Sequence, residues 1–164
     1  MSRTAVYTGS FDPVTLGHLN IIERASTLVD RLIVGIGINI EKQALFSLEE
    51  RIAMLQRATR HLPNVDVQSF RGLAVHFVRA SGARVMLRGV RSLSDIEAEF
   101  TMTLANRKLD AGIETVFLMA DEQFSHVSSS LLKQITPLAS DDELTRFVPS
   151  DIITELRKKF PSDG

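Results

Sequence analysis

The sequence contains no cysteine among its 164 residues. Disulfide bonds, thiolate nucleophiles and cysteine-ligated metal sites are therefore excluded. An excess of charge of one sign is also missing, because 19 basic and 20 acidic residues leave a formal net charge of -1. Proteins that bind nucleic acid in general carry a strong basic excess. We therefore expect no nucleic-acid partner, although a few basic residues could still serve a small anionic substrate.

Long hydrophobic runs are absent as well. No apolar stretch approaches the roughly 20 residues that cross a bilayer, and the first residues lack the charged and then apolar layout of a secretory signal. We expect no membrane partner and a cytoplasmic location. With 44% hydrophobic and 24% charged residues, the chain is predicted to form a single globular domain over residues 1–164.

Strand-like and helix-like patterns alternate along the chain. Short apolar runs predict strands at residues 5–7, 32–38, 65–67, 85–87 and 115–119, with helical spacing between and after them. Capping boxes at Ser47-Leu48-Glu49-Glu50 and Ser94-x-x-Glu97 predict two helix starts, and Gly82 predicts a helix end. This order favours an α/β fold with a parallel five-stranded sheet and helices on both faces. Ligands of such folds bind beyond the carboxyl ends of the strands.

The first such strand end carries the most informative motif. Gly9-Ser10-Phe11-Asp12-Pro13 leads into Thr15-Leu16-Gly17-His18, where a helical pattern begins. Thr15 is placed as the N-cap, and His18 falls in the first turn. A helix start offers unpaired N–H groups to an anion, and a histidine can add one more donor. The spacing therefore predicts a phosphate site, whereas nothing else supports a hydrolase triad of Ser10, Asp12 and His18.

Two later segments follow predicted strands in the same way. Arg88-Gly89-Val90-Arg91 offers two guanidinium groups that match phosphate oxygens. Phe124-Ser125-His126-Val127-Ser128-Ser129-Ser130 places three hydroxyls at a helix start. Lys42 and Glu99, judged by spacing alone, would be solvated surface residues. The histidines show no metal-ligand spacing, so no residue is predicted to bind a metal.

Taken together, these motifs resemble the signature of the nucleotidylyltransferase superfamily. Lys42, Glu99 and the two later segments make the chain similar to the phosphopantetheine adenylyltransferase family within it. The resemblance implies a Rossmann-like doubly wound domain. It further implies transfer of AMP from ATP to 4′-phosphopantetheine, which gives dephospho-coenzyme A and pyrophosphate. Mg²⁺ would be carried mainly by the ATP phosphates, and the family implies a homo-oligomer, a hexamer.

The resemblance also assigns roles to residues. His18 would stabilise the pentacovalent phosphorus, with Lys42 and Arg88 as further catalytic groups. Ser10, Lys42, Arg88 and the backbone at Ala74 would bind 4′-phosphopantetheine. ATP would be bound by Ser10, Phe11 (through its backbone), His18, Gly89, Val90, Arg91, Glu99, Phe124, Ser125, His126, Val127, Ser128, Ser129 and Ser130.

The mechanism implied is a direct in-line attack by the acceptor phosphate on the α-phosphorus of ATP. The nucleophile is already an anion, so catalysis would depend on positioning and on stabilising oxygen charge. Two alternatives stay open. One is a nucleotidylyltransferase with another phosphate-bearing acceptor, such as nicotinate mononucleotide or a phosphorylated alcohol. The other is a non-catalytic nucleotide-binding module.

Overall fold

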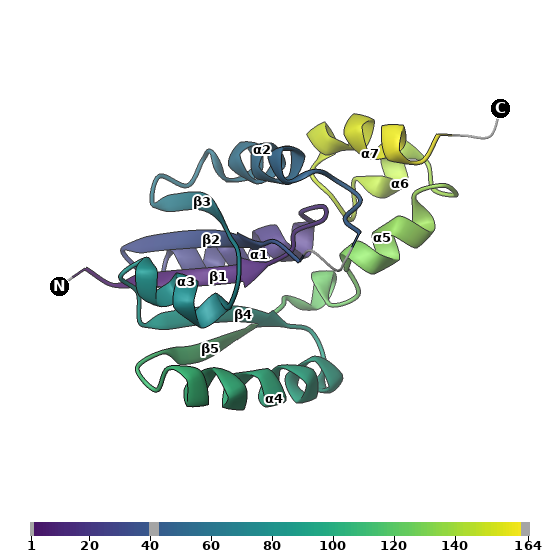
Figure 1. The fold of residues 1–164 in the computed structure, drawn as a ribbon. Coiled ribbons are helices and arrows are strands. Elements are labelled where there is room, and N and C mark those ends of the chain that lie inside the picture. The colour runs from purple at the N-terminus through teal and green to yellow at the C-terminus, as the bar shows by residue number, and fades with distance from the viewer. Residues whose placement is uncertain (1, 40–42, 162–164) are drawn as a thin grey trace.

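A parallel sheet organises the computed structural model, which describes residues 2–39 and 43–161. Its strands are β1 (Thr4–Gly9), β2 (Arg31–Gly37), β3 (Val65–Phe70), β4 (Val85–Val90) and β5 (Glu114–Met119). The strand order is β3-β2-β1-β4-β5, with every neighbouring pair parallel (Figure 1). The predicted five-stranded parallel sheet is thereby confirmed. Because the strand order reverses between β1 and β4, the segments that follow these two strands run to opposite faces of the sheet and leave a crevice outside their carboxyl ends, where ligands of this fold class bind.

Helices cover both faces of the sheet, as predicted. They are α1 (Leu16–Ser26), α2 (Leu48–Thr59), α3 (Ala74–Ala80), α4 (Leu93–Leu109), α5 (Ser129–Ile135), α6 (Asp141–Leu144) and α7 (Ile153–Lys159), with short 3₁₀ turns η1 (Glu122–Phe124) and η2 (Ser150–Ile152). One core cluster joins α1, α2 and the C-terminal helices to one face, and a smaller cluster joins α3 to the other. Figure 1 shows α5, α6 and α7 gathered near the carboxyl ends of the strands.

Local hydrogen bonds explain where the helices begin. Thr15 caps α1 and Ser47 caps α2, each in a reciprocal box with the residue three positions later. The predicted box at Ser94 and Glu97 is wrong, because the cap of α4 is Ser92, whose hydroxyl accepts from the Asp95 N–H at 3.2 Å. The sequence offers two candidate N-caps here, because Ser92 and Ser94 are each followed three residues later by an acidic residue. The spacing of serine and acid alone does not distinguish them.

Glycine ends α3 as the sequence predicts. Gly82 has a φ of +74°, and its N–H donates to the carbonyl of Arg79, while the next N–H, from Ala83, donates to that of Val78. This is the pattern of a helix that closes through a left-handed residue. The chain is thereby turned directly into β4, which carries Arg88.

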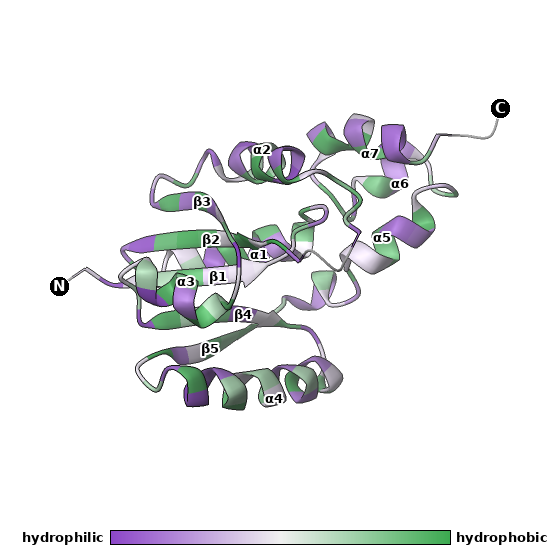
Figure 2. Ribbon diagram, in the orientation of Figure 1, coloured by the Kyte–Doolittle hydropathy of each residue, from purple (hydrophilic) through white to green (hydrophobic). Residues whose placement is uncertain are grey.

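Apolar side chains remain exposed on α4 and on the edge strand β5. Phe100 is 61% exposed and Met119 64% exposed. Figure 2 shows hydrophobic and hydrophilic residues interleaved along α4 beside β5. Nothing in the described part of the chain covers these side chains. Among the described residues, no helix is long and apolar enough to cross a membrane.

Candidate active site

The turn after β1 forms the centre of the candidate site. Phe11 has a φ of 47°, the left-handed conformation that lets the chain reverse sharply. Its ring is buried and meets Tyr7 at 5.3 Å and His18 at 4.9 Å between centroids, both edge to face. A side chain on Gly9 would lie only 3.1 Å from that ring. The ring of Phe11 therefore belongs to the core, and the contact between its backbone and ATP stays a prediction.

A buried carboxylate fixes the turn from below. Asp12 is 5% exposed. Its oxygens accept hydrogen bonds from the N–H groups of Leu45 at 2.7 Å and Phe46 at 2.8 Å, and from the Lys133 ammonium at 3.2 Å. All of these partners lie far away in the sequence. Since both oxygens are engaged, Asp12 acts as an anchor, which removes it from the hydrolase triad considered above.

Arg51 holds the same turn from the side of α2. This arginine is 7% exposed, and its guanidinium donates to the Ser10 carbonyl at 3.1 Å and to the Ser47 carbonyl at 3.4 Å. Ser10 is thus fixed through its backbone, while its exposed side chain stays available. No sequence pattern indicated Arg51 or Lys133, because their partners are set by tertiary packing.

His18 is oriented by the cap of α1. The Thr15 N–H donates to its Nδ1 at 3.1 Å. A backbone N–H can only donate, so Nδ1 must accept and the ring hydrogen of a neutral imidazole lies on Nε2. Burial, with smaller contributions from the Arg91 and Arg88 cations, lowers the pKa of His18 to about 4. At neutral pH the residue is therefore an uncharged Nε2–H donor at the cavity wall.

Arg88 and Glu99 form a pair across the carboxyl end of β4. The Arg88 Nη2 lies 2.6 Å from a Glu99 oxygen, and Nε lies 3.0 and 3.1 Å from the two oxygens. The remaining Nη1 donates to the Thr8 carbonyl at 2.6 Å. The fork is thereby locked in one orientation. Glu99, predicted to contact ATP, faces Arg88 in this structure.

Arg91 connects its own segment, residues 88–91, to the serine-rich segment at residues 124–130. Its Nη1 donates to the Val127 carbonyl at 3.0 Å, and its Nε approaches Asp95 at 3.3 Å. Nearby, Ser128 caps α5 by accepting from the Leu131 N–H at 3.0 Å. The Ser129 hydroxyl donates to the Pro13 carbonyl at 3.0 Å. The serine segment therefore packs against the turn of β1, as expected for parts of one site.

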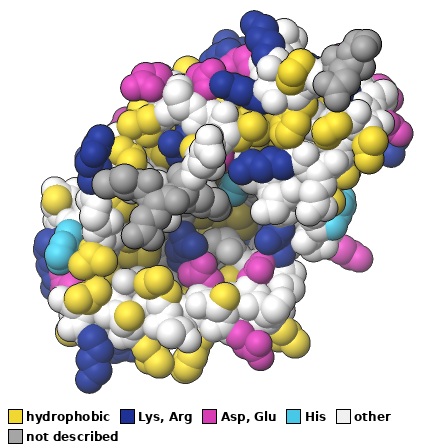
Figure 3. Space-filling view, turned by 45° about the vertical axis from the view of Figure 1, so that its right-hand side comes forward, with side chains coloured by type: hydrophobic (Ala, Val, Ile, Leu, Met, Phe, Trp, Pro, Cys, Tyr) yellow, Lys and Arg dark blue, Asp and Glu magenta, His cyan; other side chains and the backbone are white. Residues whose placement is uncertain are grey.

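Two cavities meet at this turn. One, of about 340 Å³, is lined by His18, Arg91 and the residues of the α5 start. The other, of about 690 Å³, lies on the α3 side and is lined by Ala74, Met102 and Asn106, among others. Thr8, Gly9, Ser10, Arg88 and Glu99 line both. Figure 3 shows a hollow on this face with basic and acidic side chains gathered around it.

Most of the predicted site residues are brought together. The smaller cavity is lined by Ser10, Phe11, His18, Arg88, Gly89, Arg91, Glu99, Val127, Ser128, Ser129 and Ser130. Ala74 lines only the larger one. Val90, Phe124, Ser125 and His126 line neither; Val90 is buried, and the His126 ring packs on Phe147 at 5.8 Å. The prediction for Lys42 lies outside the described residues.

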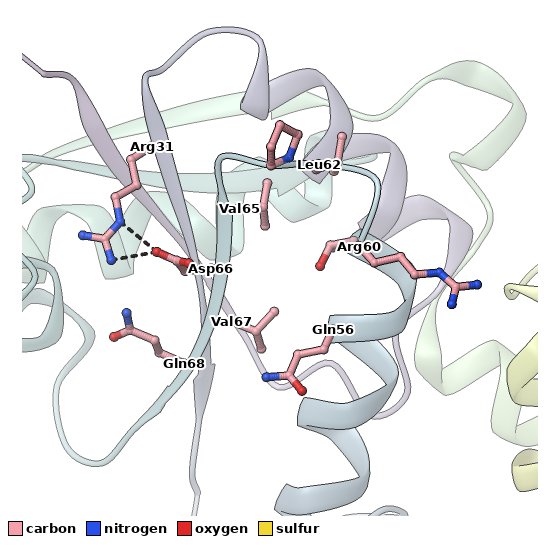
Figure 4. A pocket seen from close by; sticks show the side chains of 10 residues that line it. Arg31, Gln56, Arg60, Leu62, Val65, Asp66, Val67 and Gln68 are labelled. Carbon is pink, nitrogen blue, oxygen red and sulfur yellow. Dashed lines mark hydrogen bonds and ion pairs between the residues drawn. The ribbon is translucent and has the colours of Figure 1, made fainter.

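A further depression of about 540 Å³ lies at the other end of the sheet (Figure 4). It is lined by the start of β2, the end of α2 and β3, and it contains none of the predicted residues. Arg31 on its wall pairs with Asp66 at 2.7 Å. Its position at the amino ends of the strands is not where ligands of this fold class bind.

No preformed metal cage is present among the described residues, where no group of three His, Asp or Glu side chains could hold an ion. The carboxylates around the two cavities are already paired: Asp12 with Lys133, Asp95 with Arg91, and Glu99 with Arg88. Metal binding by the protein alone would have to break these pairs.

Comparison with known proteins identifies the family of the chain. Residues 6–135 match a family described as cytidylyltransferase-like. The chain is 68% identical over 157 residues to a phosphopantetheine adenylyltransferase of Rhodopirellula baltica, covering 95% of this chain and 88% of the relative. It is 46% identical to a phosphopantetheine adenylyltransferase of Clostridium botulinum, covering 96% of this chain and 98% of that protein.

Solved structures share the fold at lower identity. A nicotinic acid mononucleotide adenylyltransferase of Plasmodium falciparum, complexed with NaAD, superimposes with a TM-score of 0.69 at 12% identity and covers 98% of both chains. A bifunctional NMN adenylyltransferase/ADP ribose pyrophosphatase of Francisella tularensis gives a TM-score of 0.66 at 14% identity, over 96% of this chain and 50% of that one. At these identities, both similarities show a shared fold and nothing more.

Proposed function

The chain belongs to the cytidylyltransferase-like family and, within it, to the phosphopantetheine adenylyltransferases, and from this premise we propose how its residues perform the reaction. The resemblance inferred from the sequence motifs is confirmed. The protein is an adenylyltransferase of coenzyme A biosynthesis: the adenylyl group of ATP passes to 4′-phosphopantetheine, giving dephospho-coenzyme A and pyrophosphate.

The two cavities suggest one place for each substrate. ATP would occupy the smaller cavity, because His18, Arg91 and the serines of the α5 start supply donors for phosphate oxygens. 4′-Phosphopantetheine would occupy the larger one, whose wall includes Phe70, Leu73 and Met102 and suits an uncharged arm. The single observation that carries this proposal is that the cavities share Ser10 and Arg88, so two phosphate groups can meet there.

Catalysis would then rest on preorganised donors. The acceptor phosphate attacks the α-phosphorus, and the bond to the pyrophosphate oxygen breaks. The His18 Nε2–H would donate to an oxygen on which negative charge grows, and its lowered pKa suits a donor that keeps its proton throughout. Arg88, locked by Glu99 and Thr8, would hold the attacking phosphate without reorganising. The role of Lys42 stays a prediction from the resemblance.

Mg²⁺ would arrive with ATP. The paired carboxylates around the cavities fit a metal bound mainly by phosphate oxygens and water, as Mg²⁺ commonly is. When bound, the ion would neutralise charge on the triphosphate. Hydroxyls such as that of Ser10 could complete its shell, because Ser10 is exposed where the cavities meet.

We also propose that copies of this chain associate, as the resemblance implies. The exposed apolar side chains of α4 and β5 support this, because several large apolar side chains exposed on neighbouring elements commonly mark an interface. Adjacent Met102 lines the larger cavity, so association on this face would lie next to the acceptor site.

Pyrophosphate release tests the function directly. Purified protein with ATP and Mg²⁺ should release pyrophosphate when 4′-phosphopantetheine is added. Nicotinate mononucleotide and a phosphorylated alcohol serve as matched acceptors. Release with one of these instead would transfer the assignment to another nucleotidylyltransferase. ATP binding without release for any acceptor would support a non-catalytic module.

A further inference from the structure

Tyr7 lies in the middle of β1 with its ring in the core beneath α1. The residue is 6% exposed and packs edge to face on Phe11. Neighbouring positions on the same face of β1 and β2 are apolar, among them Ala5 and Val34. The ring thus serves the core, as a phenylalanine would. The hydroxyl at its end needs a separate explanation, because removing a polar group from water costs free energy unless it gains a partner.

This hydroxyl has no hydrogen-bond partner within residues 2–39 and 43–161. In that same part of the chain, every fully enclosed side-chain nitrogen or oxygen does have a partner. The hydroxyl of Tyr7 is therefore not fully enclosed. Tyr7 lines the smaller cavity, so the opening that its hydroxyl reaches is the one proposed for ATP. The group is thus a spare donor and acceptor on the floor of that cavity.

The neighbours of the hydroxyl indicate which part of a nucleotide it would meet. A Cβ on Gly89 would lie 3.4 Å from the hydroxyl oxygen and 3.2 Å from Cγ1 of Ile21. Glycine at this position therefore keeps the backbone of β4 close to both groups. Apolar Ile21 and Ala120 belong to the same cavity wall. Such surroundings suit the nucleoside half of a nucleotide better than its phosphates, which the helix starts and Arg91 would hold.

The protonation state of Tyr7 fits this assignment. Burial raises the pKa of Tyr7 to about 12, even though the Arg88 and Arg91 cations act in the opposite direction. Glu99, the other charged group that acts on it, raises the pKa further. The phenol therefore keeps its hydrogen at every pH at which the enzyme would work. It can donate one hydrogen bond and accept another.

We propose that the Tyr7 hydroxyl forms a hydrogen bond with a ribose hydroxyl of bound ATP. This inference rests on the proposed function, since it places ATP in the smaller cavity. It assigns Tyr7 a contact in nucleotide recognition that neither the sequence motifs nor the resemblance had singled out. The ring packs the core, and the hydroxyl recognises the sugar.

Calorimetric titration of wild type and Tyr7→Phe tests the contact. Phenylalanine keeps the ring on Phe11 and removes only the oxygen. ATP should bind the variant roughly three- to tenfold more weakly, the effect of one net hydrogen bond. Tripolyphosphate, which has no ribose, should bind both proteins equally. One of 2′-deoxy-ATP and 3′-deoxy-ATP should bind wild type more weakly than ATP does, yet lose nothing further in the variant.

A second measurement needs no variant. Tyr7 is the only tyrosine in the chain, so protein labelled with [¹³Cζ]tyrosine gives a single resonance from the carbon that carries the hydroxyl. ATP and adenosine should shift this resonance, and tripolyphosphate should leave it in place.

Four results would overturn the inference. ATP could bind wild type and Tyr7→Phe equally well, or the substitution could weaken tripolyphosphate binding as much as ATP binding. Both deoxy-ATPs could lose the same affinity in the two proteins, or saturating ATP could leave the tyrosine resonance unmoved. A wild-type chain that binds no ATP would overturn the proposed function as well. Wild type that binds ATP and transfers its adenylyl group, but shows no dependence on the Tyr7 oxygen, would overturn this inference alone.

Discussion

At the scale of single residues, a backbone N–H decides what His18 can do. The Thr15 amide points at Nδ1, so the ring presents Nε2–H to the cavity, and burial keeps the ring neutral. The positive charges of Arg91 and Arg88 lower the pKa of His18 further. This residue therefore combines two tasks, a helix cap and a donor, that the sequence pattern alone suggests separately.

Replacing His18 with alanine should remove the Nε2–H donor, together with the acceptor that pairs the Thr15 N–H. We expect kcat to fall by about 10²–10³, the usual cost of losing one preorganised donor, with a much smaller change in ATP affinity. Steady-state kinetics and calorimetry measure the two quantities. His61→Ala is the matched control, because His61 is exposed and pairs with Glu23 at the surface. Near-normal turnover of His18→Ala would contradict the assigned role.

The lowered pKa of His18 also predicts a pH dependence. An unperturbed histidine would charge near pH 6.5, whereas His18 charges near pH 4. The unfolded chain then binds more protons than the folded chain between these values, so this residue makes stability decrease as pH falls from about 6.5 to 4. Urea unfolding across that range should show the decrease in wild type and a smaller one in His18→Ala. The kcat profile should lack a step near pH 6.5 from His18.

Arg88 offers a test of geometry separate from charge. Its planar fork binds the Glu99 carboxylate at two points and the Thr8 carbonyl at a third, a geometry that a lysine ammonium does not reproduce. Arg88→Lys should therefore raise KM for 4′-phosphopantetheine by roughly tenfold or more, the scale of about 1.4 kcal/mol per decade, while KM for ATP changes less. Arg84→Lys, an exposed position before the same strand, is the control. Equal effects on both substrates would argue against the assignment of Arg88 to the acceptor.

At the scale of elements, the turn after β1 depends on distant segments. Asp12 joins it to the backbone before α2 and to Lys133 of α5, and Arg51 of α2 holds its other side. Residues before and within α2, together with Lys133 of α5, hold this turn in place. Its conformation follows from packing across the carboxyl ends of the strands.

Asp12→Asn should weaken this joint. An amide keeps one acceptor oxygen, but its NH₂ would face either an N–H donor or the Lys133 ammonium. We expect a loss of about 2–4 kcal/mol in the free energy of unfolding, since the asparagine leaves charged and N–H groups unpaired. Urea denaturation measures it. Lys133→Met in the Asp12→Asn background should cost little more, because the partner is already lost. A loss equal to the sum of the two single changes would show that the pair is not coupled.

Patterns in the sequence predicted the sheet and the helix order because each strand and helix carries its own periodicity. Thr15 with His18 and Ser47 with Glu50 were readable since both partners of a cap lie within one turn. Asp12, Arg51 and Lys133 were not, because the hydrogen bonds by which they hold the turn join segments 33 to 121 residues apart. The prediction of Ser94 as an N-cap was wrong for a different reason: the nearby Ser92 has the same spacing to an acidic residue and is the cap in the structure. The sequence therefore located the motifs proposed to bind phosphate, but it did not indicate the hydrogen bonds that hold them in place.

At the scale of the whole molecule, the reversal of strand order creates two cavities on opposite faces of one sheet. The smaller belongs to the face of Tyr7 and Ile21, and the larger to the face of Met86 and Ala74. They join only around the ends of β1 and β4. Two substrates approaching from opposite faces would therefore meet at Ser10 and Arg88 without competing for the rest of their sites.

The exposed apolar side chains of α4 and β5 lead to a prediction about oligomeric state. If copies of the chain associate through it, a charge placed on that surface should separate them, because burying an unpaired carboxylate is costly. Phe100→Glu with Leu104→Glu, at positions 61% and 52% exposed, should therefore give a monomer by light scattering coupled to size exclusion, while wild type gives a closed oligomer. Leu138→Glu is the control, since Leu138 is 88% exposed on another segment.

A wild type that is monomeric at micromolar concentration would contradict the proposal. An oligomer that survives the double substitution would place the contact elsewhere. Because Met102 and Asn106 lie on the same helix and line the larger cavity but not the smaller one, separation should also raise KM for 4′-phosphopantetheine more than KM for ATP.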